Sequence, residues 1–313
     1  MGARPGHDAE TRHTSDFDDK RIWTGWFRRV YKFARGFTRA AHGCTKKPEG
    51  NIMGHQYISL GAACNAAMMI KKLGLRKTFY PFDWLFNLDS GLASVTEMIQ
   101  DDFQKVCAPD CYMPASHSTL TTEVVAYRDY PTVLHIHTNP MSKTGEHDEL
   151  VRRFDRFRRA LRSRDKLHFV YYRDLAAARL TDPSATARQV LKQLIDEARI
   201  FLDTISAWRG GDTCLLLVLE TGIEDIEPAS IALASATLPD GRIHIGHAIS
   251  RYDENPVFND VWKRQWTDLL LNQTEMPVHL TACALAKLYF RRLKSFINGD
   301  RLPPVSLPSP LTH

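Results

Sequence analysis

One cysteine stands where a strand pattern gives way to a helix pattern, a position that suits nucleophilic chemistry. Cys64 follows the β-rich run at residues 56–60 and the turn residue Gly61, and a helix pattern begins at Asn65. Unpaired backbone N–H groups converge at a helix N-terminus, and the helix dipole favours a thiolate there. The same amides can hold the oxyanion that forms when a thiol attacks an acyl carbonyl. We therefore take Cys64 as the candidate nucleophile, the alternative being a small buried hydrophobe.

A cysteine nucleophile needs a base that takes its proton and a third group that orients the base. His135 and His137 lie in a predicted strand over residues 132–137, two positions apart and hence on one face. We prefer His137 as the base because it is nearer the C-terminal end of its strand, where open α/β sheets place their sites. His135 is the alternative, and each could instead be a hydrogen-bonded core or rim histidine.

Two acids are candidates for the orienting group. Asp174 follows the predicted strand at residues 167–172, from which it could reach the imidazole. Asp83 is the competitor, inside the aromatic loop at residues 79–84. Its alternative role is structural, capping a turn while Phe82 and Trp84 anchor the loop.

Small and aromatic residues beside these positions are candidates for substrate binding. Gly61, Ala62 and Ala63 would let a substrate approach the backbone closely. Trp84 offers a flat face that could stack on a ligand or pack in a core.

The elements that must position these residues alternate along the chain. Helices are predicted over residues 65–73, 92–103, 147–162, 186–208 and 257–271, and strands over 56–60, 132–137, 167–172, 213–220 and 242–249, the last as an edge strand. Continuous apolar strands separated by helices indicate a three-layer α/β fold, with a mostly parallel sheet and helices on both faces. A papain-like α+β arrangement is the alternative.

Composition divides the chain into four parts. Residues 1–19 read as a disordered acidic tail, 20–52 as a basic amphipathic helix and linker, 53–300 as a single α/β domain that carries the Cys/His site, and 301–313 as a Pro-rich tail. Residues 20–47 hold no acidic side chain and have an aromatic stripe. They could lie on an anionic membrane surface or pack on the domain.

Bulk composition excludes several classes of protein. Hydrophobic residues make up 43% and charged residues 25%, as in an ordinary globular protein. No apolar run is long enough to span a bilayer, and the N-terminus lacks a secretory pattern, so we expect a cytoplasmic protein, with a peripheral position at the inner membrane surface as the alternative. Phosphate-binding glycine motifs are absent, and no nucleic-acid partner is expected because no recognition fold accompanies the basic segment.

Neither a metal nor an organic cofactor is expected. Cys107 and Cys111 form a close pair, but no second pair with zinc-site spacing follows them. His244 and His247 are three apart on a predicted strand, which sends them to opposite faces. Cys214 lies inside the apolar run at residues 213–220 and is predicted to be a core residue.

Three blocks of this sequence resemble a known family. They are Ser59-Leu60-Gly61-Ala62-Ala63-Cys64, Leu73-Gly74-Leu75-Arg76 and Pro81-Phe82-Asp83-Trp84. This pattern is similar to the signature of a family of uncharacterised bacterial proteins described as putative papain-like cysteine peptidases. In that family a histidine on a later strand and an arginine-rich helix follow, which would correspond here to His137 and to Arg152, Arg153, Arg156, Arg158 and Arg159.

The resemblance implies a thiol-dependent hydrolase, or a related acyltransferase, with Cys64 as nucleophile. Its substrate would be a peptide, an ester or a glycan-linked acyl group. A hypothesis of a different class is a non-catalytic binding module associated with surface-polysaccharide handling. The two differ at Cys64, because an enzyme needs a reactive thiol whereas a binding module tolerates Cys64→Ser.

Overall fold

The computed structural model describes residues 54–87, 91–116, 123–250 and 256–272 of the 313-residue chain. The chain divides into two compact units, Met1–Ile52 and Met53–His313. The described residues all belong to the second unit. The acidic tail, the basic helix and the Pro-rich tail predicted from the sequence lie outside them.

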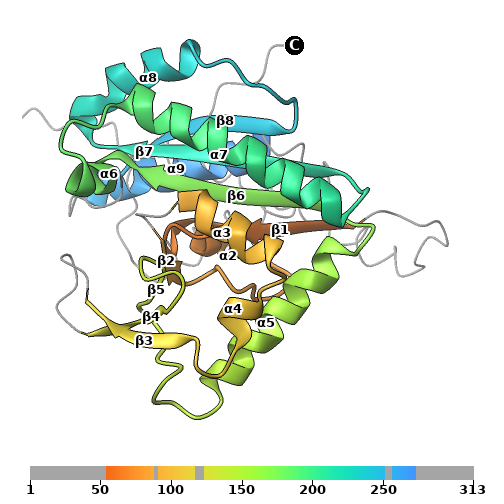
Figure 1. Ribbon diagram of the computed structural model, residues 1–313. Coiled ribbons are helices and arrows are strands. Elements are labelled where there is room, and N and C mark those ends of the chain that lie inside the picture. The colour runs from red at the N-terminus through yellow and green to blue at the C-terminus, as the bar shows by residue number, and fades with distance from the viewer. Residues whose placement is uncertain (1–53, 88–90, 117–122, 251–255, 273–313) are drawn as a thin grey trace, which may run out of the picture. The chain divides into compact units, whose positions relative to one another are not determined.

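A four-stranded parallel sheet forms the centre of this unit (Figure 1). Its strands are β1 (His55–Ser59), β6 (Lys166–Asp174), β7 (Thr213–Thr221) and β8 (Ile243–Ile249), and they lie in that order across the sheet. Every residue of β7 is buried, as expected of a continuous apolar strand between two neighbours. β8 has one paired edge and partly buried positions, which agrees with the predicted edge strand.

Helices cover both faces of this sheet. On β6, Phe169 packs edge-to-face on Phe201 of α7 (Ala187–Trp208), whereas Tyr172 packs on Trp266 of α9 (Pro256–Asn272). Because 169 and 172 differ by an odd number of positions, their side chains point to opposite faces. Figure 1 shows α7 together with α8 (Ile226–Ala234) along one side of the sheet. The three-layer α/β architecture predicted from the sequence is therefore confirmed.

A second, antiparallel sheet was not predicted. It orders β2 (Leu85–Phe86), β5 (Leu134–His135), β4 (Val124–Tyr127) and β3 (Tyr112–Ala115). The strand predicted over residues 132–137 is thus wrong in extent and in place, since only Leu134 and His135 pair, and they do so in this small sheet. A tight turn joins β4 to β5, with the Tyr130 amide bonded to the Tyr127 carbonyl at 3.1 Å. Such a short connection makes a hairpin and cannot make a parallel crossover.

The remaining described helices pack around these sheets. They are α2 (Asn65–Leu73), α3 (Gly91–Gln100), α4 (Gln104–Cys107), α5 (Glu146–Leu161), α6 (Leu175–Thr181) and the single 3-10 turn η1 (Ile223–Asp225). α2 ends at Gly74, which adopts φ 75° and closes the helix with its N–H. Within the described ranges, no helix is long and apolar enough to cross a bilayer.

Candidate functional site

The turn between β1 and α2 has an unusual backbone. Gly61 adopts φ 92° and Ala62 adopts φ 51°, both in the left-handed region. A Cβ added at Gly61 would lie 2.9 Å from Oδ1 of Asn87, so glycine is required there for close approach as well as for conformation. Asn87 Oδ1 accepts the Ala62 N–H at 2.7 Å, and the Asn87 N–H donates to the Ala62 carbonyl at 2.8 Å. Asn87, just after β2, therefore fixes the turn from both sides.

Cys64 is the N-cap residue of α2 and is partly exposed. Of the amides predicted to face a substrate, Gly61 N–H already donates to Ser59 Oγ at 3.3 Å and Ala62 N–H to Asn87. The amides of Ala63 and Cys64 have no acceptor among the described residues. An oxyanion would therefore be held by these last two amides.

His137 lies on the surface beside the aromatic loop. Its exposed ring meets Trp84 edge-to-face, with centroids 5.7 Å apart and an interplanar angle of 90°. No hydrogen bond joins His137 to Cys64 among the residues that the structure describes. The imidazole is thus held by an aromatic contact, and its pairing with the thiol stays a prediction.

His135, the alternative base, has a different environment. It is buried between Tyr112 and Tyr127, with ring centroids 5.6 and 4.7 Å away. Burial, together with the charge of Arg153, lowers the pKa of His135 to about 3. Such a histidine stays neutral at ordinary pH and belongs to the core of the antiparallel sheet.

The two candidate acids each have protein partners other than a histidine. Asp83 is buried, accepts the Tyr80 N–H at 3.1 Å and lies 4.0 Å from Arg76. Burial raises the pKa of Asp83 to about 7. Its neighbour Phe82 packs edge-to-face on Phe154 and Phe157 of α5, which anchors the loop.

Asp174 caps α6 at the end of β6. Its Oδ1 accepts the Ala176 N–H at 2.8 Å and the Ala177 N–H at 3.3 Å, and its Oδ2 accepts from Ser250 Oγ at 2.9 Å. Burial raises the pKa of this carboxyl. Neither acid is hydrogen-bonded to His137 within the described residues, so the orienting role of Asp83 or Asp174 stays a prediction.

A buried carboxyl that the sequence reasoning missed lies next to this site. Glu220, near the end of β7, is fully buried and stands in register with Asp174 on the neighbouring strand. Its Oε1 accepts the indole N–H groups of Trp262 and Trp266, each at 2.7 Å, and its carboxylate accepts from Asn65 at 3.1 Å. Burial, reinforced by the Asp174 charge, raises the pKa of Glu220 to about 8. One signal was available: Glu220 is the charged residue in an otherwise apolar strand.

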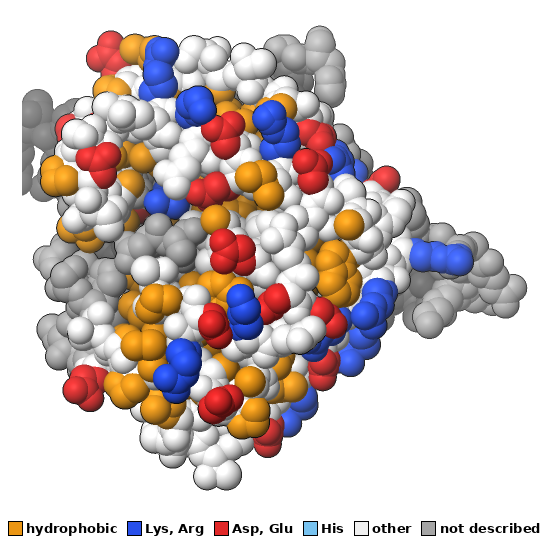
Figure 2. Space-filling model, in the orientation of Figure 1, with side chains coloured by type: hydrophobic (Ala, Val, Ile, Leu, Met, Phe, Trp, Pro, Cys, Tyr) orange, Lys and Arg blue, Asp and Glu red, His pale blue; other side chains and the backbone are white. Residues whose placement is uncertain are grey.

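The arginine-rich helix is held by ion pairs along α5. Glu149 lies within 3.2 Å of Arg152, Arg153 and Arg156, and hydrogen bonds from these arginines, that of Arg156 first, lower the pKa of Glu149 to about 2. Arg158 pairs with Asp102 and Asp155. Figure 2 likewise shows acidic and basic side chains interspersed over this face of the molecule. Four of the five arginines of this helix thus have acidic partners within the described residues.

No group of three or more His, Cys, Asp and Glu side chains in the described ranges is arranged to hold a metal ion. The groups that the β1–α2 turn itself offers are a partly exposed thiol and two amides, and the sequence analysis predicts an imidazole as their partner. These are the parts used in acyl transfer through a covalent intermediate.

Comparisons with known proteins bear on this site. Residues 55–204 match the model of a protein family described as "Putative papain-like cysteine peptidase". An uncharacterised protein of Acanthamoeba polyphaga mimivirus is 28% identical over 160 residues, which are 45% of this chain and 68% of the viral protein. No solved structure matches the chain. The description of the matched family supports a peptidase-like function.

The matched segment contains Cys64, Asp83, His137 and Asp174, and it ends within α7, before β7, β8 and α9. The resemblance predicted from the Cys64 and Trp84 motifs is confirmed: over residues 55–204, this chain matches the family described as putative papain-like cysteine peptidases.

Proposed function

We propose that this protein is a thiol-dependent hydrolase that cleaves peptide bonds with Cys64 as its nucleophile. One observation carries the proposal: a partly exposed thiol stands at the start of the nine-residue helix α2, beside two amides, those of Ala63 and Cys64, without a described acceptor. The family match over residues 55–204 makes a peptide the first substrate to test.

The reaction would proceed through an acyl-enzyme. The Cys64 sulfur attacks the scissile carbonyl, and the oxyanion is bound by the Ala63 and Cys64 amides at the positive end of the α2 dipole. A base takes the thiol proton and returns it to the leaving amine, after which water hydrolyses the thioester.

His137 is the base that we propose. Its ring is exposed and its orientation is set by Trp84. Catalytic hydrogen bonds are often long in ligand-free enzymes and tighten with substrate bound, so we expect the His137–Cys64 pair to form in that complex. Trp84, which is partly exposed beside His137, is the residue that we propose to contact the substrate.

Cleavage of fluorescein-labelled casein by the full chain tests the proposal. We expect casein to be cleaved by wild type and not by Cys64→Ala. Cys111→Ala is the matched control, because Cys111 is a buried thiol that donates to the Val106 carbonyl and has no place in the site. Cleavage by Cys64→Ala at the wild-type rate would exclude Cys64 as the nucleophile.

Thiol reactivity gives a second readout that does not depend on substrate choice. At pH 7, Cys64 should be alkylated by iodoacetamide faster than the other five cysteines, and this advantage should be lost in His137→Ala. A reactive Cys64 without casein cleavage would direct the search to ester or glycan-linked acyl substrates. An unreactive Cys64 would favour a binding module, which tolerates Cys64→Ser.

A further inference from the structure

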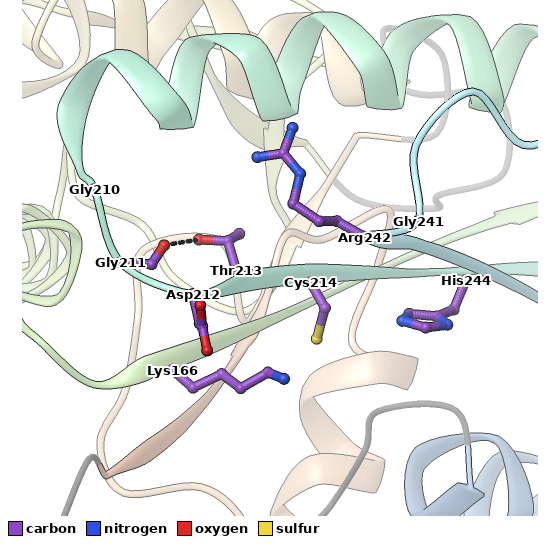
Figure 3. A pocket seen from close by; sticks show the side chains of 9 residues that line it. All are labelled: Lys166, Gly210, Gly211, Asp212, Thr213, Cys214, Gly241, Arg242 and His244. Atoms are coloured by element: carbon purple, nitrogen blue, oxygen red, sulfur yellow. Dashed lines mark hydrogen bonds between the residues drawn. The ribbon is translucent and has the colours of Figure 1, made fainter.

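A cavity lies at the N-terminal ends of strands β6, β7 and β8, which is the end of the parallel sheet opposite to the one where Cys64 follows β1. It has a volume of about 270 Å³ and is lined by Lys166, Gly210, Gly211, Asp212, Thr213, Cys214, Gly241, Arg242 and His244. Figure 3 shows the Cys214 sulfur and the His244 ring extending from the same side of their strands. Cys64 lies after the C-terminal end of β1, so this cavity is separate from the candidate site.

Cys214 has the histidine partner that Cys64 lacks in the described residues. Its Sγ lies 3.0 Å from Nδ1 of His168, the residue in register with it on β6. His168 Nε2 in turn lies 2.8 Å from Nδ1 of His55 on β1. Covalent catalysis uses this arrangement, in which a nucleophile is hydrogen-bonded to a base and the base is hydrogen-bonded to a third group.

The reaction needs one tautomer of His168, because either ring nitrogen can be the donor in these two hydrogen bonds. When His168 carries its proton on Nε2 and donates it to His55, its Nδ1 is the acceptor that faces the Cys214 thiol. In that tautomer His55 accepts from His168 and takes the place of the third member of a catalytic triad.

Ring stacking holds His168 in this orientation. Tyr57, its register partner on β1, stacks on the imidazole with centroids 4.3 Å apart and an interplanar angle of 7°. His55 stacks as well, at 5.1 Å. His168 is fully buried, so its position does not depend on an exposed loop.

The surroundings keep His168 neutral. Burial is the main cause that lowers the pKa of His168 to about 3, and the charges of His55, Lys166 and His244 act in the same direction. The imidazole is thus neutral at neutral pH and can hold an added proton only transiently, since the imidazolium is costly. Because protonation of His168 is costly, we expect an acyl donor with a good leaving group to be the kind that reacts at Cys214.

We propose that Cys214 is a second acyl-accepting thiol, which takes a small acyl group from an activated ester or thioester that enters the cavity. The sulfur bonds to the carbonyl carbon as the bond from that carbon to the leaving oxygen or sulfur breaks. His168 takes the thiol proton at Nδ1 and passes it to the leaving group. Water then hydrolyses the thioester, which releases the acid and restores the thiol. The cavity volume is at the small end for ligand pockets, which limits the acyl group to a few atoms.

The test is the position and rate of acetylation by 4-nitrophenyl acetate in the full-length protein. The reaction is quenched at short times, and acetyl groups are located on cysteine peptides by mass spectrometry. Cys111 is the internal control, because it is as buried as Cys214, each with 4% exposure, but donates to a carbonyl in place of a histidine. We expect Cys214 to be acetylated at least about tenfold faster than Cys111, since a positioned base accelerates such steps.

His168→Gln supplies the matched variant. It should reduce acetylation of Cys214 to the rate of Cys111 and leave acetylation of Cys64 unchanged. Equal rates at Cys214 and Cys111 in wild type would overturn the proposal without any variant, so it can fail even if His168→Gln does not fold. Acetylation of Cys64 is measured on a separate peptide. The result at Cys214 therefore neither supports nor contradicts the function proposed for Cys64.

Discussion

Asn65 donates its side-chain amide to Glu220, with Nδ2 3.1 Å from one carboxylate oxygen and 3.3 Å from the other. This bond joins the first residue of α2, immediately after Cys64, to the C-terminal end of the central strand β7. The same carboxylate holds Trp262 and Trp266 of α9. The orientation of the helix that presents Cys64 is thus tied to a part of the chain that the family match does not cover.

Glu220→Ala should therefore destabilise the protein strongly. It removes the acceptor of three buried hydrogen bonds, those from Asn65, Trp262 and Trp266, and a buried donor that is left unsatisfied costs about 1–3 kcal/mol. We expect a loss of about 3–5 kcal/mol in the free energy of unfolding, measured by urea denaturation. Glu227→Ala, on the exposed side of α8, is the control and should change it by less than about 0.5 kcal/mol. Similar losses for the two variants would contradict the role assigned to Glu220.

The burial of Glu220 should also make the stability of the protein depend on pH. The pKa of Glu220 rises from 4.5 in the unfolded chain to about 8 in the folded state. Between these values the folded protein binds the proton that the unfolded chain releases, so the contribution of Glu220 to stability is fully present below pH 4.5 and is lost as pH rises towards 8. Asp83 acts with the same sign over the window from 3.8 to about 7.

Glu220→Gln removes one of these titrations and keeps an acceptor for the indoles. We expect its melting temperature to fall less between pH 5 and pH 8 than that of wild type, with Asp83→Asn flattening the curve only below about pH 7. Parallel curves for wild type and Glu220→Gln would mean that Glu220 is ionised throughout.

The strongly periodic elements could be predicted from the sequence, and the short ones could not. α2, α5 and α7 were predicted to within a residue or two because their apolar positions repeat with the helical period over many residues. β2 and β5 have two paired residues each, too few for any alternation to show. Their pairing comes from tertiary contacts.

The candidate site was predictable in its local part only. Cys64 and its glycine turn are neighbours in sequence, whereas Asn65 and Glu220 are 155 residues apart and meet through the fold of the sheet. His168 and Cys214 were missed as a pair for the same reason: their contact depends on the register of β6 against β7.

The glycine turn gives a test of how strictly Cys64 must be placed. Gly61→Ala forces a side chain into φ 92° and against Asn87, so we expect a destabilisation of about 1–3 kcal/mol and a marked loss of Cys64 alkylation and casein cleavage. Gly241→Ala is the matched control, because no atom lies within 4 Å of the added Cβ. A Gly61→Ala protein with wild-type thiol reactivity would show that the turn is not needed for the chemistry.

The buried and the exposed aromatic residues of the loop at residues 79–84 should contribute differently to stability. Phe82 is 1% exposed and contacts Phe154 and Phe157, so Phe82→Ala should cost about 3–5 kcal/mol in unfolding free energy. Phe79, at the other end of the loop, is 40% exposed, and Phe79→Ala should cost about 1 kcal/mol or less. Chemical denaturation measures both, and equal costs would mean that Phe82 does not anchor the loop to α5.

Substitutions of His135, in the short strand β5, and of His137, two residues later, should affect different properties. The first should change stability, and the second should change the reactivity of Cys64. His135 fills a buried space between two tyrosines, so His135→Ala should lower the unfolding free energy by about 2 kcal/mol while the remaining folded protein keeps its Cys64 reactivity. His137 is exposed, and His137→Ala should leave stability within about 0.5 kcal/mol of wild type but remove the alkylation advantage of Cys64. Thermal unfolding and alkylation are measured on the same samples. If His135→Ala lost thiol reactivity and His137→Ala did not, the base would have to be assigned to His135, and Cys64 would have to approach the core of the antiparallel sheet.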